Sequence, residues 1–174
     1  PGREIHFRKV DIGHEFVQNC VLPEKLPEVA GYVLAKATKP ASPIISDYYD
    51  VCEFADGTFG IFLAGGPRTG VSGAMTMLMV RTAFQSLAAF GLPPMKLLEE
   101  LHETIRGDLR EGMTIPAVYA LLDPQAHTLT AAQAGAPGPL VWNRMATRAQ
   151  PTRTDGTPLS AAEFEPSDER TIPL

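Results

Sequence analysis

Two adjacent helical patterns, with strand patterns before and after them, constrain the fold of this chain more than any other feature of its sequence. The first helical pattern covers residues 71–90, where Arg81 is the only charged residue, and the second runs from Pro94 to Gly107. Patterns typical of strands cover residues 31–37, 48–54, 58–63, 115–122, 128–134 and 139–145. Elements that are segregated in this way favour an α+β domain over an alternating parallel sheet.

Length and charge narrow the classes of function. A chain of 174 residues is long enough for one domain with a substantial core, and its formal net charge of −5 argues against non-specific binding of nucleic acid or of an anionic membrane. No apolar stretch has the length needed to span a bilayer and no signal-peptide pattern opens the sequence, so we expect a cytoplasmic protein. Cys20 and Cys52 lack the spacing of metal ligands and are interpreted as reduced thiols in the core.

Several other residues have simple structural interpretations. We expect Asp50 to be exposed at the start of a strand, and the methionines of the first helix, including Met75 and Met79, to fill the core. Because the apolar residues of this helix form two stripes, we expect it to pack on two sides. The four histidines are expected on the solvated surface: His6, His14, His102 and His127.

A glycine-rich loop lies between the apolar segment 58–63 and the first helix. Its sequence, Gly65-Gly-Pro-Arg-Thr-Gly70, resembles a P-loop in which Val71 stands where the lysine should be. A valine cannot supply the positive charge that this lysine places on the nucleotide phosphates. A degenerate P-loop nucleotide-binding domain, with 118–123 as its acidic strand, therefore remains one alternative.

Several short motifs along the chain belong together. They are Leu22-Pro23, Leu26-Pro27, Gly31-Tyr32, Asp47-Tyr48-Tyr49-Asp50, Gly60-Ile61-Phe62-Leu63, Ala117-Val118-Tyr119, Ala134-Gly135 and Pro137-Gly138-Pro139-Leu140. In this order, and over roughly residues 16–174, the sequence resembles the SpoIIE/RsbU-like branch of the PPM serine/threonine phosphatases. The resemblance implies a PPM-like β-sandwich flanked by helices, in α-β-β-α layers, over residues 23–174 without its C-terminal part. Residues 1–22 would then form an N-terminal helix or linker from an upstream region.

The resemblance also implies a centre of two Mn²⁺ or Mg²⁺ ions, which generate the hydroxide that attacks a phosphoserine or phosphothreonine. Asp47 matches one metal ligand of the family, and Gly66 matches a position that offers its backbone carbonyl. The bridging aspartate of the family, however, falls on Gly65, and the histidine of its later Asn-Ala-Gly-His segment falls on Ala136. One dependable carboxylate and the neighbouring Arg68 would repel a pair of dications more than hold it.

These departures lead to two hypotheses beside the P-loop alternative. The first is a pseudophosphatase of bacterial partner-switching or stress signalling, with manganese or magnesium absent or weakly bound and no catalytic residue of its own. It would bind a phosphorylated STAS-type or anti-sigma regulator, and the N-terminal helix could form a homodimer. The second is an active protein serine phosphatase with an altered metal set.

Overall fold

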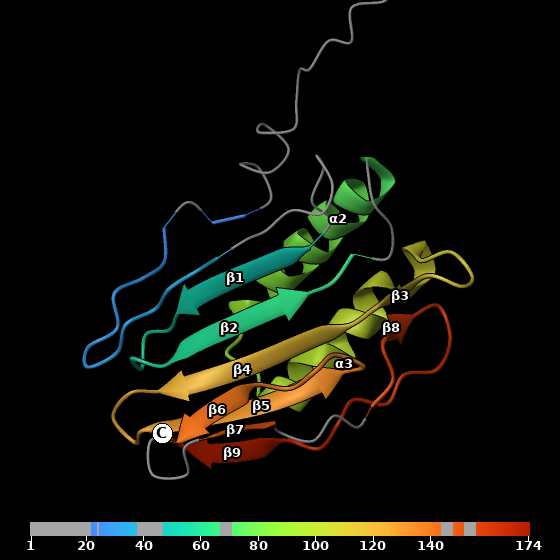
Figure 1. The fold of residues 1–174 in the computed structure, drawn as a ribbon. Coiled ribbons are helices and arrows are strands. Elements are labelled where there is room, and N and C mark those ends of the chain that lie inside the picture. The colour runs from blue at the N-terminus through green and yellow to red at the C-terminus, as the bar shows by residue number, and fades with distance from the viewer. Residues whose placement is uncertain (1–21, 24, 38–46, 67–70, 144–147, 152–155) are drawn as a thin grey trace, which may run out of the picture.

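The computed structural model describes residues 22–23, 25–37, 47–66, 71–143, 148–151 and 156–174. Its centre is a five-stranded sheet in the order β1-β2-β4-β5-β9, in which every neighbouring pair is antiparallel (Figure 1). The strands of this sheet are β1 Tyr48–Glu53, β2 Phe59–Ala64, β4 Ala117–Asp123, β5 Thr128–Ala134 and β9 Arg170–Pro173. Two short antiparallel pairs accompany it: β3 Thr114–Ile115 with β8 Leu159–Ser160, and β6 Leu140–Asn143 with β7 Arg148–Pro151. The expected α+β class is confirmed.

Helices cover one face of the sheet (Figure 1). They are α2 Val71–Ala88 and α3 Pro94–Ile105, followed by the short 3-10 helix η1 Arg106–Asp108. The proline at the first position of α3 needs no hydrogen bond there and has the backbone angle that a helix requires. Both helices agree with the sequence prediction, which differs from the structure by only a few residues at their ends.

An aromatic cluster joins α2 to the middle of the sheet. The rings of Phe62 and Phe84 stack with their centroids 4.3 Å apart, and Tyr48 and Tyr119 meet Phe84 edge-on at 6.3 and 5.8 Å. All four side chains are fully buried. Burial of such large rings is the dominant favourable contribution to a core of this kind.

The opposite face of the sheet carries a smaller cluster. Val29, Phe59 and Leu122 are buried there, and Tyr32 and Leu34 pack against them. Tyr32 belongs to a tight turn that begins at Val29 and passes through Gly31 with φ of 80°. The predicted strand over 31–37 is therefore wrong, because the chain turns at Gly31 and residues 33–37 pair with no strand among the described residues. The expected helix before Pro23 lies outside the described residues.

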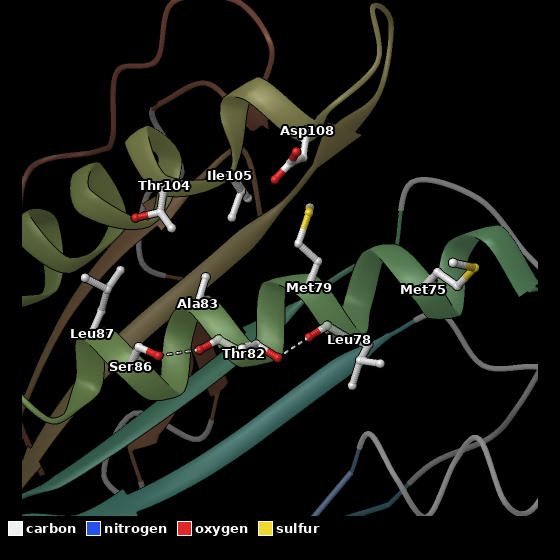
Figure 2. A pocket seen from close by; sticks show the side chains of 10 residues that line it. All are labelled: Met75, Leu78, Met79, Thr82, Ala83, Ser86, Leu87, Thr104, Ile105 and Asp108. Carbon is white, nitrogen blue, oxygen red and sulfur yellow. Dashed lines mark hydrogen bonds between the residues drawn. The ribbon is translucent and has the colours of Figure 1, made fainter.

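One of the two apolar stripes of α2, that with Met75 and Leu78, is largely exposed, contrary to the expectation that this helix packs on two sides. Met75 is 67% exposed and Leu78 44%, and with Met79 and Leu87 they line an apolar groove of about 620 Å³ between α2 and α3 (Figure 2). Hydroxyl groups in the groove are bonded to their own helices, as Thr82 Oγ1 donates to the Leu78 carbonyl at 2.9 Å. Met77 is the methionine of α2 that fills the core, so the prediction for Met75 is wrong.

His102 of α3 is buried and not on the solvated surface. Its Nε2 atom lies 2.9 Å from the carbonyl oxygen of Ser160 and 3.1 Å from that of Ala162, and its ring stacks on Phe164 at 4.8 Å. This side chain therefore holds the segment after β8 against α3. The C-terminal part of the chain adds the strands β8 and β9, beyond the strand patterns found in the sequence.

Candidate active site at one end of the sheet

The antiparallel order of the strands brings four separate parts of the chain to one end of the sheet. Asp47 lies at the start of β1, Gly65 and Gly66 follow β2, Pro116 precedes β4, and Ala136 follows β5. The register pairs Tyr48 with Ala64 and Ala64 with Ala117, so these ends are level with one another. They surround a cavity of about 500 Å³. The structure thus brings together Asp47 and Gly66, the two metal-site residues expected from the sequence.

Asp47 makes one hydrogen bond in this cavity. Its exposed carboxylate accepts the backbone N–H of Gly66 at Oδ1, with an N–O distance of 3.3 Å. Because the Gly66 N–H already bonds to Asp47 Oδ1, it competes with any cation for that oxygen. Among the described residues Asp47 forms no ion pair.

Gly65 stands where the resemblance places a bridging aspartate, and Pro116 faces it. The Gly65 N–H donates to the Pro116 carbonyl at 2.8 Å, which continues the pairing of β2 with β4. A Cβ atom at Gly65 would lie 3.2 Å from Cγ of Pro116, so a side chain fits only if the proline ring shifts by a few tenths of an ångström. No pattern in the sequence indicates this proximity, because the two residues meet only through strand pairing.

The segment that corresponds to Asn-Ala-Gly-His closes the far side of the cavity. Gln133 is buried, its N–H donates to Ser167 Oγ at 2.8 Å, and the Ser167 N–H donates back to its carbonyl at 2.9 Å. Gly135 has φ of 61°, and a Cβ there would lie 2.7 Å from the Pro158 nitrogen, so only glycine fits. Ala136, at the family's histidine position, contributes a methyl group to the cavity wall. This side of the cavity supplies no ligand side chain.

Asp50 is half-buried and takes part in a hydrogen-bond network, whereas an exposed residue was predicted. The Tyr48 hydroxyl donates to Asp50 Oδ2 at 2.7 Å, Gln85 Nε2 of α2 donates to the same oxygen at 2.9 Å, and the Val51 N–H donates to Oδ1 at 2.9 Å. Burial, followed by the hydrogen bond and charge of Asp50, raises the pKa of Tyr48 far above its ordinary value. Asp50 therefore ties β1 to α2 and is not directed to metal binding.

The P-loop alternative is excluded by the sheet. A P-loop strand lies in a parallel sheet, whereas β2 is antiparallel to both of its neighbours, β1 and β4. Residues 67–70 of the glycine-rich loop lie outside the described residues.

Among those described, no helix has the length and hydropathy needed to cross a bilayer.

The antiparallel sheet with two consecutive helices on one face has the fold of PPM-type phosphatase domains. The chain belongs to the SpoIIE family, because the model of that family, described as stage II sporulation protein E, matches residues 55–174. The resemblance stated from the sequence is thus confirmed.

Three known proteins illustrate the relationship. Phosphoserine phosphatase RsbU of Bacillus subtilis (strain 168) is 27% identical over 119 residues, which are 68% of this chain and 35% of the relative. The structure of the RsbU and RsbW domains of Rv1364c from Mycobacterium tuberculosis has a TM-score of 0.63 and 22% identity, over 79% of this chain and 38% of that chain. The structure of RsbX in complex with magnesium has a TM-score of 0.57 and 12% identity, over 79% of this chain and 64% of that one. The chain therefore spans about a third of the length of the curated relative.

The residues of this chain fit a metal pair poorly, although a protein of the same fold binds magnesium. Within the described ranges, no group of three or more histidine, cysteine, aspartate or glutamate side chains could hold a metal ion. Mg²⁺ and Mn²⁺ prefer carboxylate and carbonyl oxygens, of which the cavity offers one carboxylate, that of Asp47. The other described residues that line the cavity are glycine, alanine, proline, leucine, valine and tyrosine, none of which has a carboxylate side chain.

Proposed function

We propose that this domain is a non-catalytic member of its family, which binds a regulatory protein in bacterial partner-switching or stress signalling and does not dephosphorylate it. The observation that supports this proposal is the facing pair Gly65 and Pro116. The position of the bridging carboxylate has no side chain, and a proline ring lies 3.2 Å from where its Cβ would be.

The electrostatic reason follows from the number of ligands. Two dications a few ångströms apart repel each other strongly and are held together only by anionic oxygens that they share. Asp47 supplies a single negative charge and already accepts a hydrogen bond from Gly66. Manganese or magnesium would therefore bind weakly or not at all.

The partner is inferred from the relatives. RsbU is named a phosphoserine phosphatase, and the M. tuberculosis structure joins an RsbU domain to an RsbW domain. We infer that the partner here is a phosphorylated STAS-type or anti-sigma regulator in the cytoplasm. Residues 1–22 would connect the domain, 23–174, to an upstream region and could mediate a homodimer.

An active phosphatase with an altered metal set is the second candidate, since Asp47 and the Gly66 carbonyl could still contribute two oxygen ligands. Calorimetric titration with Mn²⁺, together with hydrolysis of a phosphoserine peptide, separates the two candidates. We expect neither heat of binding nor turnover. Metal-dependent turnover that disappears in Asp47→Ala would contradict the non-catalytic proposal.

The substitution Gly65→Asp tests the position of the lost ligand. It should raise the affinity for Mn²⁺, and Gly65→Asp combined with Pro116→Ala should raise it further, because the second change removes the 3.2 Å contact. The matched control is Gly107→Asp, where no atom lies within 4 Å of an added Cβ and no effect on metal binding is expected. Equal affinity in all three variants would show that Gly65 is not at the metal position.

A further inference from the structure

We propose that the cavity beside Asp47 binds a lysine side chain presented by the partner protein, with the ammonium group paired to the Asp47 carboxylate. This inference rests on the proposed function, because it requires a protein partner. It goes further in assigning a ligand to the cavity in place of the metal pair.

The charge of the cavity selects the sign of the ligand. Asp47 is the only charged side chain among the described residues that line the cavity. Its Oδ1 accepts the Gly66 N–H, whereas its Oδ2 makes no hydrogen bond within the described part of the chain. A free carboxylate oxygen at an exposed position attracts a cation and repels a phosphate group. The cavity would therefore recognise a basic side chain and not the phosphoryl group of the partner.

The walls of the cavity select the shape of the ligand. They are largely apolar and include Leu22, Leu63, Pro116, Val118 and Pro137. Leu63 is 49% exposed although it lies within a central strand, so its surface is available to a ligand. Lysine has a four-carbon stem that lies along apolar surface while its charged end stays near water.

The single free oxygen favours lysine over arginine. A guanidinium group pairs best with both oxygens of a carboxylate at once, through two parallel hydrogen bonds. Here one oxygen is already used by Gly66, which leaves a single-point contact. A compact ammonium group is suited to such a contact.

Nuclear magnetic resonance of the ¹⁵N-labelled chain tests the inference, with N-acetyl-lysine N-methylamide as the probe. The backbone amide of Gly66 is the reporter, because it donates to the Asp47 carboxylate. We expect a saturable shift of this amide. An exposed ion pair is worth up to about 1 kcal/mol, so the norleucine analogue, which lacks the ammonium group, should bind about fivefold more weakly.

Variants of the chain provide the controls. Asp47→Asn should weaken the lysine probe by a similar factor and leave the norleucine analogue unchanged. Asp56→Asn is the matched control, since Asp56 is an exposed carboxylate in the β1–β2 hairpin at the other end of these strands. It should leave both affinities unchanged.

Three results would overturn the inference: equal affinity for lysine and norleucine, equal affinity in Asp47→Asn, or binding that occurs only in Arg68→Ala. The last would mean that a guanidinium of this chain already occupies the cavity. Added Mn²⁺ separates this failure from failure of the proposed function. Mn²⁺-dependent turnover of a phosphoserine peptide would contradict the non-catalytic proposal, whereas a chain that shows no such turnover and does not bind the lysine probe refutes only the lysine site.

Discussion

Replacement of Gly60 by alanine should destabilise the domain, because three side chains already occupy the space of the new methyl group. A Cβ at Gly60 would lie 2.7 Å from the Tyr119 hydroxyl, 2.8 Å from Cys52 Sγ and 3.0 Å from a ring carbon of Phe54. Real Cβ contacts are longer, so all three groups must move. Overpacking of a core of this kind costs about 1–3 kcal/mol.

A smaller effect opposes this cost. The backbone angle of Gly60 is one that alanine can adopt, and replacing such a glycine stabilises a protein by about 0.4–1 kcal/mol through the unfolded chain. The net expectation is a loss of about 1–2 kcal/mol in the free energy of unfolding. Urea denaturation followed by far-ultraviolet circular dichroism measures this difference.

Tyr119→Phe provides the internal control for this prediction. The Tyr119 hydroxyl is buried and has no hydrogen-bond partner among the described residues, so its removal should be neutral or stabilising. It also removes the nearest of the three contacts, and the cost of Gly60→Ala should fall by roughly half in this background. Gly107→Ala, in open space, should change stability by less than about 0.5 kcal/mol. A neutral Gly60→Ala, or the same cost with and without the hydroxyl, would refute the packing described here.

Three further predictions concern the polar groups of the core. Asp50→Ala should cost about 1–3 kcal/mol of unfolding free energy in urea denaturation, because it leaves the buried Tyr48 hydroxyl without its acceptor. The cost should be smaller in a Tyr48→Phe background. Gln85→Ala, which removes the donor on the exposed side of Asp50, should have a smaller effect than Asp50→Ala. Burial, and then the charge of Asp50, raises the pKa of the Cys52 thiol from 9.0 to about 11. The raised pKa favours the folded state at pH values below 9, and this stabilisation is lost as the pH rises from 9 to 11. Cys52→Ala should therefore flatten that part of the curve of unfolding free energy against pH. An unchanged slope would contradict the raised pKa of Cys52. His102→Ala removes the donor to two carbonyl groups and should increase hydrogen exchange over residues 159–164, with His127→Ala as a control that leaves that segment protected.

Sequence patterns predicted the regular elements because their signals are local. The helices followed from apolar spacing, and strands β1 and β2 followed from the patterns over 48–54 and 58–63; Gly57, in the turn between them, has φ of 81°. The strand predicted over 31–37 failed because an apolar run shows only that a segment can form a strand, not that it has a partner. The turn at Gly31 decided the outcome there.

The site was predictable only in part for a similar reason. The resemblance drew attention to Asp47 and to the glycine at position 65, which are properties of single positions. The contact of Gly65 with Pro116, the bond of Asp50 to Gln85 and the burial of His102 all depend on residues far along the chain. A single sequence carries no signal for such pairings before the register of the strands is known.

If metal ligands have been lost as we propose, the separation of the core from the strand ends explains how the family fold persists without them. The stacked rings of Phe62 and Phe84 lie between the sheet and α2, whereas Asp47 and Gly65 lie beyond the ends of their strands. Backbone bonds such as that from Gly65 to Pro116 close the end of the sheet without any ligand side chain. Carboxylates gathered for metal binding repel one another when no metal is present, so the proposed replacement of one of them by Gly65 would remove a local source of strain. A well-packed core is therefore no evidence that the strand ends of this domain can hold metal.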